Sequence, residues 1–127
     1  MTPVFFVDRS LGKHDVPNAL RAAGALVEVH DAHFAQDAPD EVWLPAVGQK
    51  GWAVLTSDDR IRYRQAEKSA ATTAGVALFI FTGKRMRGAA IGDALVRALP
   101  EMTRLLQQER RPFIAKVTRT GTVSLVP

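Results

Sequence analysis

The chain has 127 residues, of which 46% are hydrophobic, and it carries a formal net charge of +4 with a pI near 10.0. This size and composition are typical of a single folded domain, residues 1–127, and exclude a largely disordered chain. Cysteine is absent, which excludes disulfides and thiolate chemistry. No apolar run reaches the ~20 residues that span a bilayer, and the N-terminal MTPVFFVD has no basic region. We therefore expect a cytoplasmic protein with no signal peptide and no membrane partner.

Short apolar runs alternate with helical patterns along the chain. In chain order we expect a strand at 4–7, a helix at 15–24, a strand at 25–29, a polar loop at 30–39, a helix at 40–51, a strand at 52–56, a helix at 59–75, a strand at 76–81, a helix at 89–109 and, around TRTG at 118–121, a C-terminal strand or hairpin. The runs VFFV and VALFIF are apolar throughout, which is typical of strands buried on both faces. The longest helix carries an apolar stripe that includes Ile91, Leu95 and Met102.

This order of elements predicts an α/β fold. Strands that alternate with amphipathic helices imply a mostly parallel central sheet of about five strands, covered by helices on both faces. The sequence shows no internal repeat, linker or low-complexity segment. One three-layer domain is the simplest organisation that fits the whole chain.

Carboxylates are placed where several of these strands end. Asp8 directly follows the first strand, and Asp58 and Asp59 follow the third, in the stretch AVLTSDDRIR. Asp40 and Glu41 open the helix that follows the second strand. Because right-handed crossovers bring the carboxyl ends of parallel strands to one edge of the sheet, we expect these acids to converge there.

Converging carboxylates repel one another unless a positive charge offsets them. A hard divalent cation such as Mg²⁺ or Mn²⁺ takes oxygen ligands and suits a cluster of Asp and Glu side chains. Bound at such a site, it would activate water and stabilise charge on a phosphoryl group. The acids therefore indicate a candidate metal site for phosphodiester chemistry.

Basic residues lie in or near the same loops. They are Arg9, Lys13, Arg60, Arg62, Arg64, Lys84, Arg85 and Arg87. The planar guanidinium group of arginine is well suited to phosphate. Charge alone leaves open a solvated surface or a polyanionic partner such as nucleic acid.

Each acidic position also has a plain structural interpretation. Asp8 can bond to backbone amides in a loop, Asp40 can serve as a helix N-cap with Glu41 favoured by the helix dipole, and Asp58 or Asp59 can cap the next helix. The catalytic interpretation depends on all three segments meeting in one place.

At these residues the sequence resembles the PIN-like nucleases, in particular the small VapC-like, toxin-type branch. The resemblance covers about residues 4–82, through FFVDRSLG, APDEVWLPAVGQKGWAVLTSDDRIR and GVALFIFTG. In that branch one Asp ends the first strand, another opens a helix in a PDE-W segment, and a third follows the third strand. The matching positions here are Asp8, Asp40 and Asp58.

The resemblance implies a PIN-like fold and a Mg²⁺- or Mn²⁺-dependent ribonuclease, many of which are toxins held inactive by a partner antitoxin. Asp8, Asp40 and Asp58 would be both metal ligands and catalytic residues, with Glu41 and Asp59 as further ligands. The substrate-binding candidates are Arg9, Arg60, Arg62, Lys84 and Arg85. Relatives often carry another acid two residues beyond the third Asp, where this chain has Arg60, and often have Asn in place of Ser10.

Histidine and tryptophan offer weaker signals. His30 and His33 flank Asp31, but a three-residue spacing in an expected loop favours a loop or substrate-facing role over a transition-metal site. Trp43 and Trp52 are expected to pack in the core rather than to stack on bases.

Two other classes of function remain open from the sequence. A receiver-like signalling domain also has an Asp after its first and third strands and a later lysine, here Lys84, but it normally carries an acid pair where this chain has Asp8 alone. A non-catalytic interaction module is the other alternative, with the helix at 89–109 as a partner or homodimer face.

Overall fold

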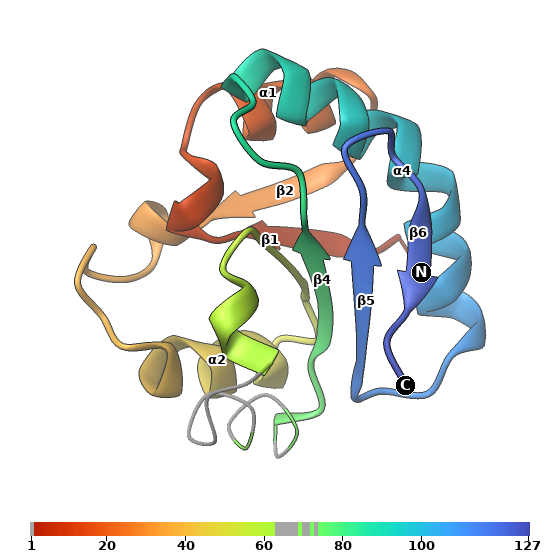
Figure 1. Cartoon of the computed structure of the whole chain (residues 1–127). Coiled ribbons are helices and arrows are strands. Elements are labelled where there is room, and N and C mark those ends of the chain that lie inside the picture. The colour runs from red at the N-terminus through yellow and green to blue at the C-terminus, as the bar shows by residue number, and fades with distance from the viewer. Residues whose placement is uncertain (1, 63–68, 70–71, 73) are drawn as a thin grey trace.

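The computed structural model describes residues 2–62, 69, 72 and 74–127, with the side chains of residues 61 and 62 left out (Figure 1). Its strands within these ranges form one six-stranded sheet: β1 (Val4–Val7), β2 (Leu26–Val29), β3 (Ala53–Thr56), β4 (Ala77–Phe81), β5 (Phe113–Val117) and β6 (Val123–Leu125). The strand order is β2-β1-β3-β4-β5-β6. The first five strands are parallel, and β6 is antiparallel to β5.

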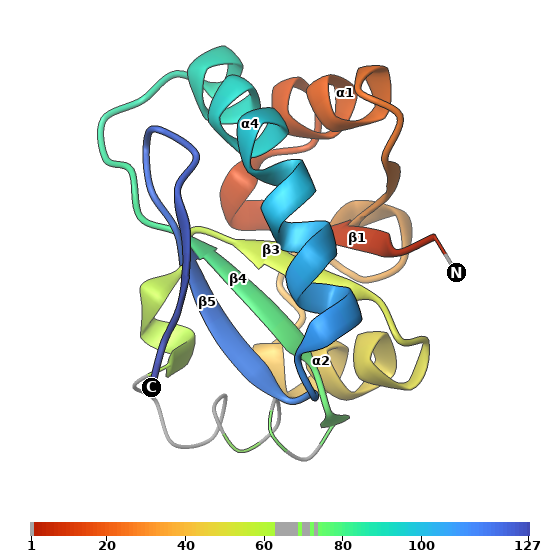
Figure 2. The same cartoon turned by 90° about the vertical axis from the view of Figure 1, so that its right-hand side faces the viewer.

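The helices cover both faces of this sheet. They are α1 (Asp15–Ala22), α2 (Asp40–Gln49) and α4 (Gly88–Gln108) in the described part of the chain. Helices α1 and α4 pack against each other on one face, and α2 lies on the other (Figures 1 and 2). The expected α/β architecture is confirmed. The sixth strand arises because the C-terminal segment forms a hairpin.

Alternation along the strands divides the core into two layers. Under α1 and α4 the sheet presents Phe5, Val7, Leu55 and Phe79, together with the further residues Phe81 and Val117. Toward α2 it presents the intervening residues Phe6, Val54, Leu78 and Ile80, which pack on Trp43, Leu44 and Val47. Side chains of a strand point alternately to its two faces, so an apolar run buries both. This explains why β4 is buried at every position.

Three local expectations differ from the structure. The loop after β1 contains a 3-10 turn at Arg9–Leu11, and the loop after β2 contains one at His30–Ala32. The helix expected at 59–75 begins as a 3-10 turn at Asp59–Arg62, and most of the rest lies outside the described residues. Such short turns are fixed by individual contacts and not by hydrophobic periodicity. One such contact is the hydrogen bond that the Asp8 carboxylate accepts from the Arg9 N–H.

The chain reverses its direction of travel across the sheet between β1 and β3. From β1 it moves outward to β2 and then crosses back to place β3 on the other side of β1. Ligands in open α/β sheets bind beyond the carboxyl ends of the strands at such a switch point. The residues that follow β1 and β3, Asp8 and Ser57–Asp58, stand at this place. Among the described residues, no helix combines the length and apolar character needed to cross a membrane.

Candidate active site

A pocket of about 600 Å³ opens at the carboxyl edge of the sheet, beside the switch point. It is lined by acidic, basic and polar residues from the segments after β1, β2, β3 and β4: Asp8, Arg9, Ser10, Gln36, Asp40, Ser57, Asp58, Asp59, Arg60 and Lys84. The structure therefore brings Asp8, Asp40 and Asp58 to one pocket.

Asp8 is the most deeply buried of the acids. It is 3% exposed, and its Oδ1 accepts a hydrogen bond from the Arg9 backbone N–H at 2.8 Å. Its Oδ2 accepts hydrogen bonds from Ser10 Oγ at 2.9 Å and Thr56 Oγ1 at 2.8 Å. A buried carboxylate needs such donors to replace its lost hydration. The loop interpretation of Asp8 thus holds locally, while one side of the residue still borders the pocket.

Thr56 links the ends of the two central strands. Its fully buried hydroxyl donates to Asp8 Oδ2 and accepts a hydrogen bond from the Asp58 N–H at 3.0 Å. This one side chain positions two of the three predicted metal ligands. The sequence interpretation did not select Thr56; the available signal was a hydroxyl residue at the end of a buried strand, just before the acids.

Asp40 is the first residue of α2 rather than its cap. Pro39 occupies the N-cap position, and Asp40 Oδ1 accepts a hydrogen bond from Trp43 Nε1 at 2.8 Å. The capping interpretation of Asp40 was therefore wrong. Arg9 NH2 lies 3.7 Å from the same carboxylate oxygen.

The pKa of Asp40 is affected by the other acids of the pocket. Burial is the main cause that raises the pKa of this carboxyl above its usual value, and the negative charges of Asp8 and Asp58 raise it further. The hydrogen bond from Trp43 and the charge of Arg9 act in the opposite direction. The three carboxylates therefore interact, as expected of groups that share one pocket.

Asp58 is bound by a neighbouring arginine. Its Oδ1 accepts hydrogen bonds from the backbone N–H of Arg60 at 3.1 Å and from Arg60 Nε at 2.9 Å, and its Oδ2 accepts one from NH2 at 3.2 Å. The bond to the backbone N–H supports the 3-10 turn that begins at Asp59, as the capping interpretation expected.

The remaining predicted site residues divide into two groups. Asp59, Arg9, Arg60 and Lys84 line the pocket. Glu41 and Arg85 are exposed and are not among the residues that line it, within the part of the chain that the structure describes. The side chain of Arg62 lies outside the described residues.

The donor set suits a hard cation in kind, since it offers carboxylate and hydroxyl oxygens in a charged pocket. Its present arrangement is less compact than a formed metal centre. Across residues 2–62, 69, 72 and 74–127, no three His, Asp or Glu side chains are grouped closely enough to hold one ion. An ion bound at Asp58 would compete with Arg60 for the two carboxylate oxygens.

The histidines and tryptophans take structural positions. His30 lies in the loop after β2, as expected, but its ring is 1% exposed and packs among Phe6, Phe34 and Trp43, so it does not face a substrate. His33 Nε2 lies 2.6 Å from Glu28 Oε1. Trp43 is fully buried, which confirms its expected core role.

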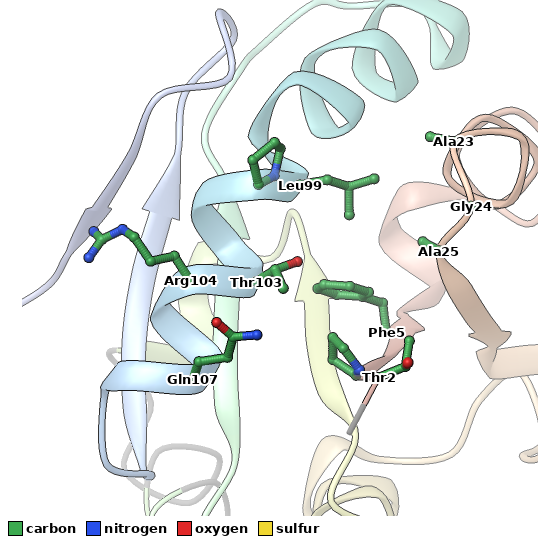
Figure 3. A pocket seen from close by; sticks show the side chains of 11 residues that line it. Thr2, Phe5, Ala23, Gly24, Ala25, Leu99, Thr103, Arg104 and Gln107 are labelled. Atoms are coloured by element: carbon green, nitrogen blue, oxygen red, sulfur yellow. The ribbon is translucent and has the colours of Figure 1, made fainter.

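An apolar pocket of about 400 Å³ lies between the start of β1 and α4 (Figure 3). Leu99 projects from α4 above Phe5, and Ala25 lies across from them. Its lining contains no carboxylate among the described residues. The chemistry of the chain therefore centres on the acidic pocket at the opposite edge.

Comparison with known proteins identifies the family. A model described as "PIN like domain" matches residues 3–83, which is more than half of the chain. The chain belongs to the PIN-like domain family, and the resemblance drawn from the acidic motifs is confirmed.

One relative extends the comparison to the VapC-like branch. The chain is 35% identical over 78 residues to a Mycobacterium tuberculosis protein named "Putative ribonuclease VapC45". The match covers 58% of this chain and 56% of that relative, so the chain spans little more than half of its length. No solved structure gives a significant match.

Proposed function

We propose that this chain is a metal-dependent endoribonuclease that hydrolyses phosphodiester bonds in RNA. The observation that supports this most directly is the meeting of Asp8, Asp40 and Asp58 in one pocket of a PIN-like chain. The ribonuclease name of its VapC relative points in the same direction. A cytoplasmic location is part of this proposal.

Three acids would act as both ligands and catalytic residues. Asp8, Asp40 and Asp58 would hold one Mg²⁺ or Mn²⁺, with Asp59 or Glu41 assisting. When bound, such an ion supplies a more acidic water and stabilises negative charge on the phosphate. The chain itself contributes the orientation of these carboxylates, which for Asp8 comes from Ser10 and Thr56.

The basic residues would bind the substrate backbone. Arg9, Arg60 and Lys84 border the acids. Arg62 and Arg85 would extend the contact along the RNA. Contacts to phosphate fix the position of a nucleic acid but carry little sequence information. RNA binding should therefore weaken as salt rises.

The proposal also includes regulation of the chain by a partner protein. By analogy with the toxin-type relatives that the sequence resembles, the chain would be the toxin of a toxin–antitoxin pair, with a protein antitoxin as its partner. A homodimer is also part of this proposal.

One observation favours a second candidate, a non-catalytic RNA-binding module. Both oxygens of Asp58 are bonded to Arg60, the residue that stands where members of the resembled family often have another acid. If this pair persists, the pocket keeps its affinity for phosphate and loses a metal ligand.

The two candidates are separated by a cleavage assay. Single-stranded RNA is incubated with the protein and Mn²⁺, and Asp8→Asn is compared with Asp93→Asn, which removes the same charge from an exposed position on α4. Cleavage that requires Mn²⁺ and is lost only in Asp8→Asn supports the enzyme. Salt-sensitive binding without cleavage by the unmodified chain supports the binding module.

A further inference from the structure

Arg9 is held beside the acidic pocket by residues from distant parts of the chain. Its NH1 lies 3.0 Å from His30 Nε2 and donates to the carbonyl oxygen of Ala38 at 2.8 Å. Its NH2 lies 3.7 Å from Asp40 Oδ1. Arg9 follows Asp8 in the chain and lines the same pocket, so its guanidinium lies beside the acids with its NH2 toward Asp40.

The contact with Arg9 defines the tautomer of His30. Arginine has donors only, so Nε2 must be the nitrogen of the ring that carries the lone pair. The ring is then neutral, with its proton on Nδ1, which lies 3.5 Å from Asp31 Oδ1. Nδ1 makes no hydrogen bond to any residue that the structure describes. The ring thus keeps a buried donor poorly satisfied while its other nitrogen accepts from Arg9.

The position of His30 is fixed by its surroundings. It follows the last residue of β2, at the same sheet edge as Asp8 and Asp58, and it packs against Phe6, Phe34 and Trp43. The ring therefore has little freedom to turn away from Arg9. In contrast, the Arg9 side chain is 33% exposed, and its NH2 and Nε make no hydrogen bonds among the described residues.

We infer that His30 is a positioning residue for substrate: it anchors one edge of the Arg9 guanidinium, so that the other edge can bind a phosphate of RNA beside Asp40. This inference rests on the proposed function, because it names how that site takes its phosphate. The energetic reason is that an arginine already ordered by the protein loses less conformational freedom on binding.

The first test measures the affinity for fluorescent single-stranded RNA in EDTA, so that no cleavage is needed. We expect Arg9→Gln and His30→Leu each to weaken binding by about 10- to 100-fold, the range set by one charge-assisted hydrogen bond. The double variant should be no weaker than Arg9→Gln, because His30 acts through Arg9. His30→Gln, whose Oε1 can accept from Arg9, should restore most of the affinity.

Losses that add in the double variant, or His30→Gln as weak as His30→Leu, would overturn the inference. Thermal unfolding of each variant checks that it is folded. A second measurement does not depend on RNA: ring ¹⁵N shifts should show a neutral His30 protonated at Nδ1, and Arg9→Gln should shift the tautomer equilibrium toward Nε2. An Nε2-protonated ring in the unmodified chain would also overturn it.

The same variants separate this inference from the nuclease proposal. If the variants bind RNA in the expected pattern but the unmodified chain does not cleave RNA in Mn²⁺, the role of His30 stands and the nuclease proposal is wrong. If the chain cleaves RNA and all variants have the same KM and the same RNA affinity, the nuclease proposal stands and the role of His30 is wrong.

Discussion

Arg60 donates from Nε to one oxygen of Asp58 and from NH2 to the other, at 2.9 and 3.2 Å. The same carboxylate is a predicted ligand for a divalent cation. Because a cation and a guanidinium would compete for these oxygens, the pair would set how readily a metal binds. Arg60 would then be a competitor for metal that is part of the chain itself.

Removing this competitor should strengthen metal binding. We expect Arg60→Gln to lower the Kd for Mn²⁺ by about 1.4- to 5-fold, since an exposed ion pair contributes ~0.2–1 kcal/mol. Isothermal titration calorimetry in the absence of RNA measures this directly. Arg110→Gln, which removes the same charge from an exposed residue beyond α4, is the matched control. Equal affinities in the two variants would mean that Arg60 does not compete with the metal.

The hydroxyl of Thr56 should be needed for both stability and the site. Thr56→Val keeps the shape of the side chain but removes the donor to Asp8 and the acceptor for the Asp58 N–H. We expect the free energy of unfolding to fall by ~1.5–3 kcal/mol, the usual contribution of hydrogen bonds to a charged group. Urea denaturation measures the loss.

Thr56→Ser is the control for this prediction, because it keeps the hydroxyl and loses one buried methyl group, worth ~1 kcal/mol. Mn²⁺ affinity should follow the hydroxyl and not the methyl group. A Val variant that binds Mn²⁺ as the Ser variant does would contradict the role assigned to Thr56.

Much of the fold could be predicted because the spacing of apolar residues along the chain shows which faces of helices and strands are buried. The apolar run at 4–7 matches β1 at both ends, and the long helix expected at 89–109 lies within one residue of α4. The strand order could not be read in this way, since it depends on which strands pack side by side. The 3-10 turns were missed because single hydrogen bonds, such as that of Asp8 with the Arg9 N–H, define them.

The site was predictable in outline and not in detail. Parallel strands bring their carboxyl ends to one edge, so a sequence argument could gather Asp8, Asp40 and Asp58 there. It could not find the partners of those acids. In the sequence, Thr56 is only the last residue of a strand and His30 only a loop residue. Their contacts with Asp8 and Arg9 form because β1, β2 and β3 lie side by side in the folded chain.

Asp40 should make stability depend on pH. Burial, aided by Asp8 and Asp58, raises its pKa in the folded chain, so the native state keeps this proton to higher pH than the unfolded chain does. The free energy of unfolding must then fall as pH rises from ~3.9, the pKa of Asp40 in the unfolded chain, to its raised pKa in the folded chain. Above that pH the loss of stability stays constant, so it is still present at neutral pH. We expect Asp40→Asn to be more stable than the unmodified chain at pH 7, with the difference vanishing below pH ~3.9.

Urea denaturation at a series of pH values measures this difference. Asn keeps an oxygen that can accept from Trp43 Nε1, so the variant isolates the charge. Glu41→Gln removes an exposed charge one residue along and should have a smaller effect. Mn²⁺ should stabilise the unmodified chain at pH 7 and not Asp40→Asn. A stability gain that is independent of pH would show that the carboxylate is not the cause.

The last prediction concerns the substrate path. Lys84 lines the acidic pocket, whereas Lys50 lies in a pocket at the opposite edge of the sheet. If single-stranded RNA passes over the acids, Lys84→Gln should reduce the slope of log Kd against log salt by about 0.7, the value for one phosphate contact on a single strand. Lys50→Gln should leave the slope unchanged. If Lys50→Gln reduces the slope as much as Lys84→Gln does, RNA binds to a broad basic surface and not specifically over the acids.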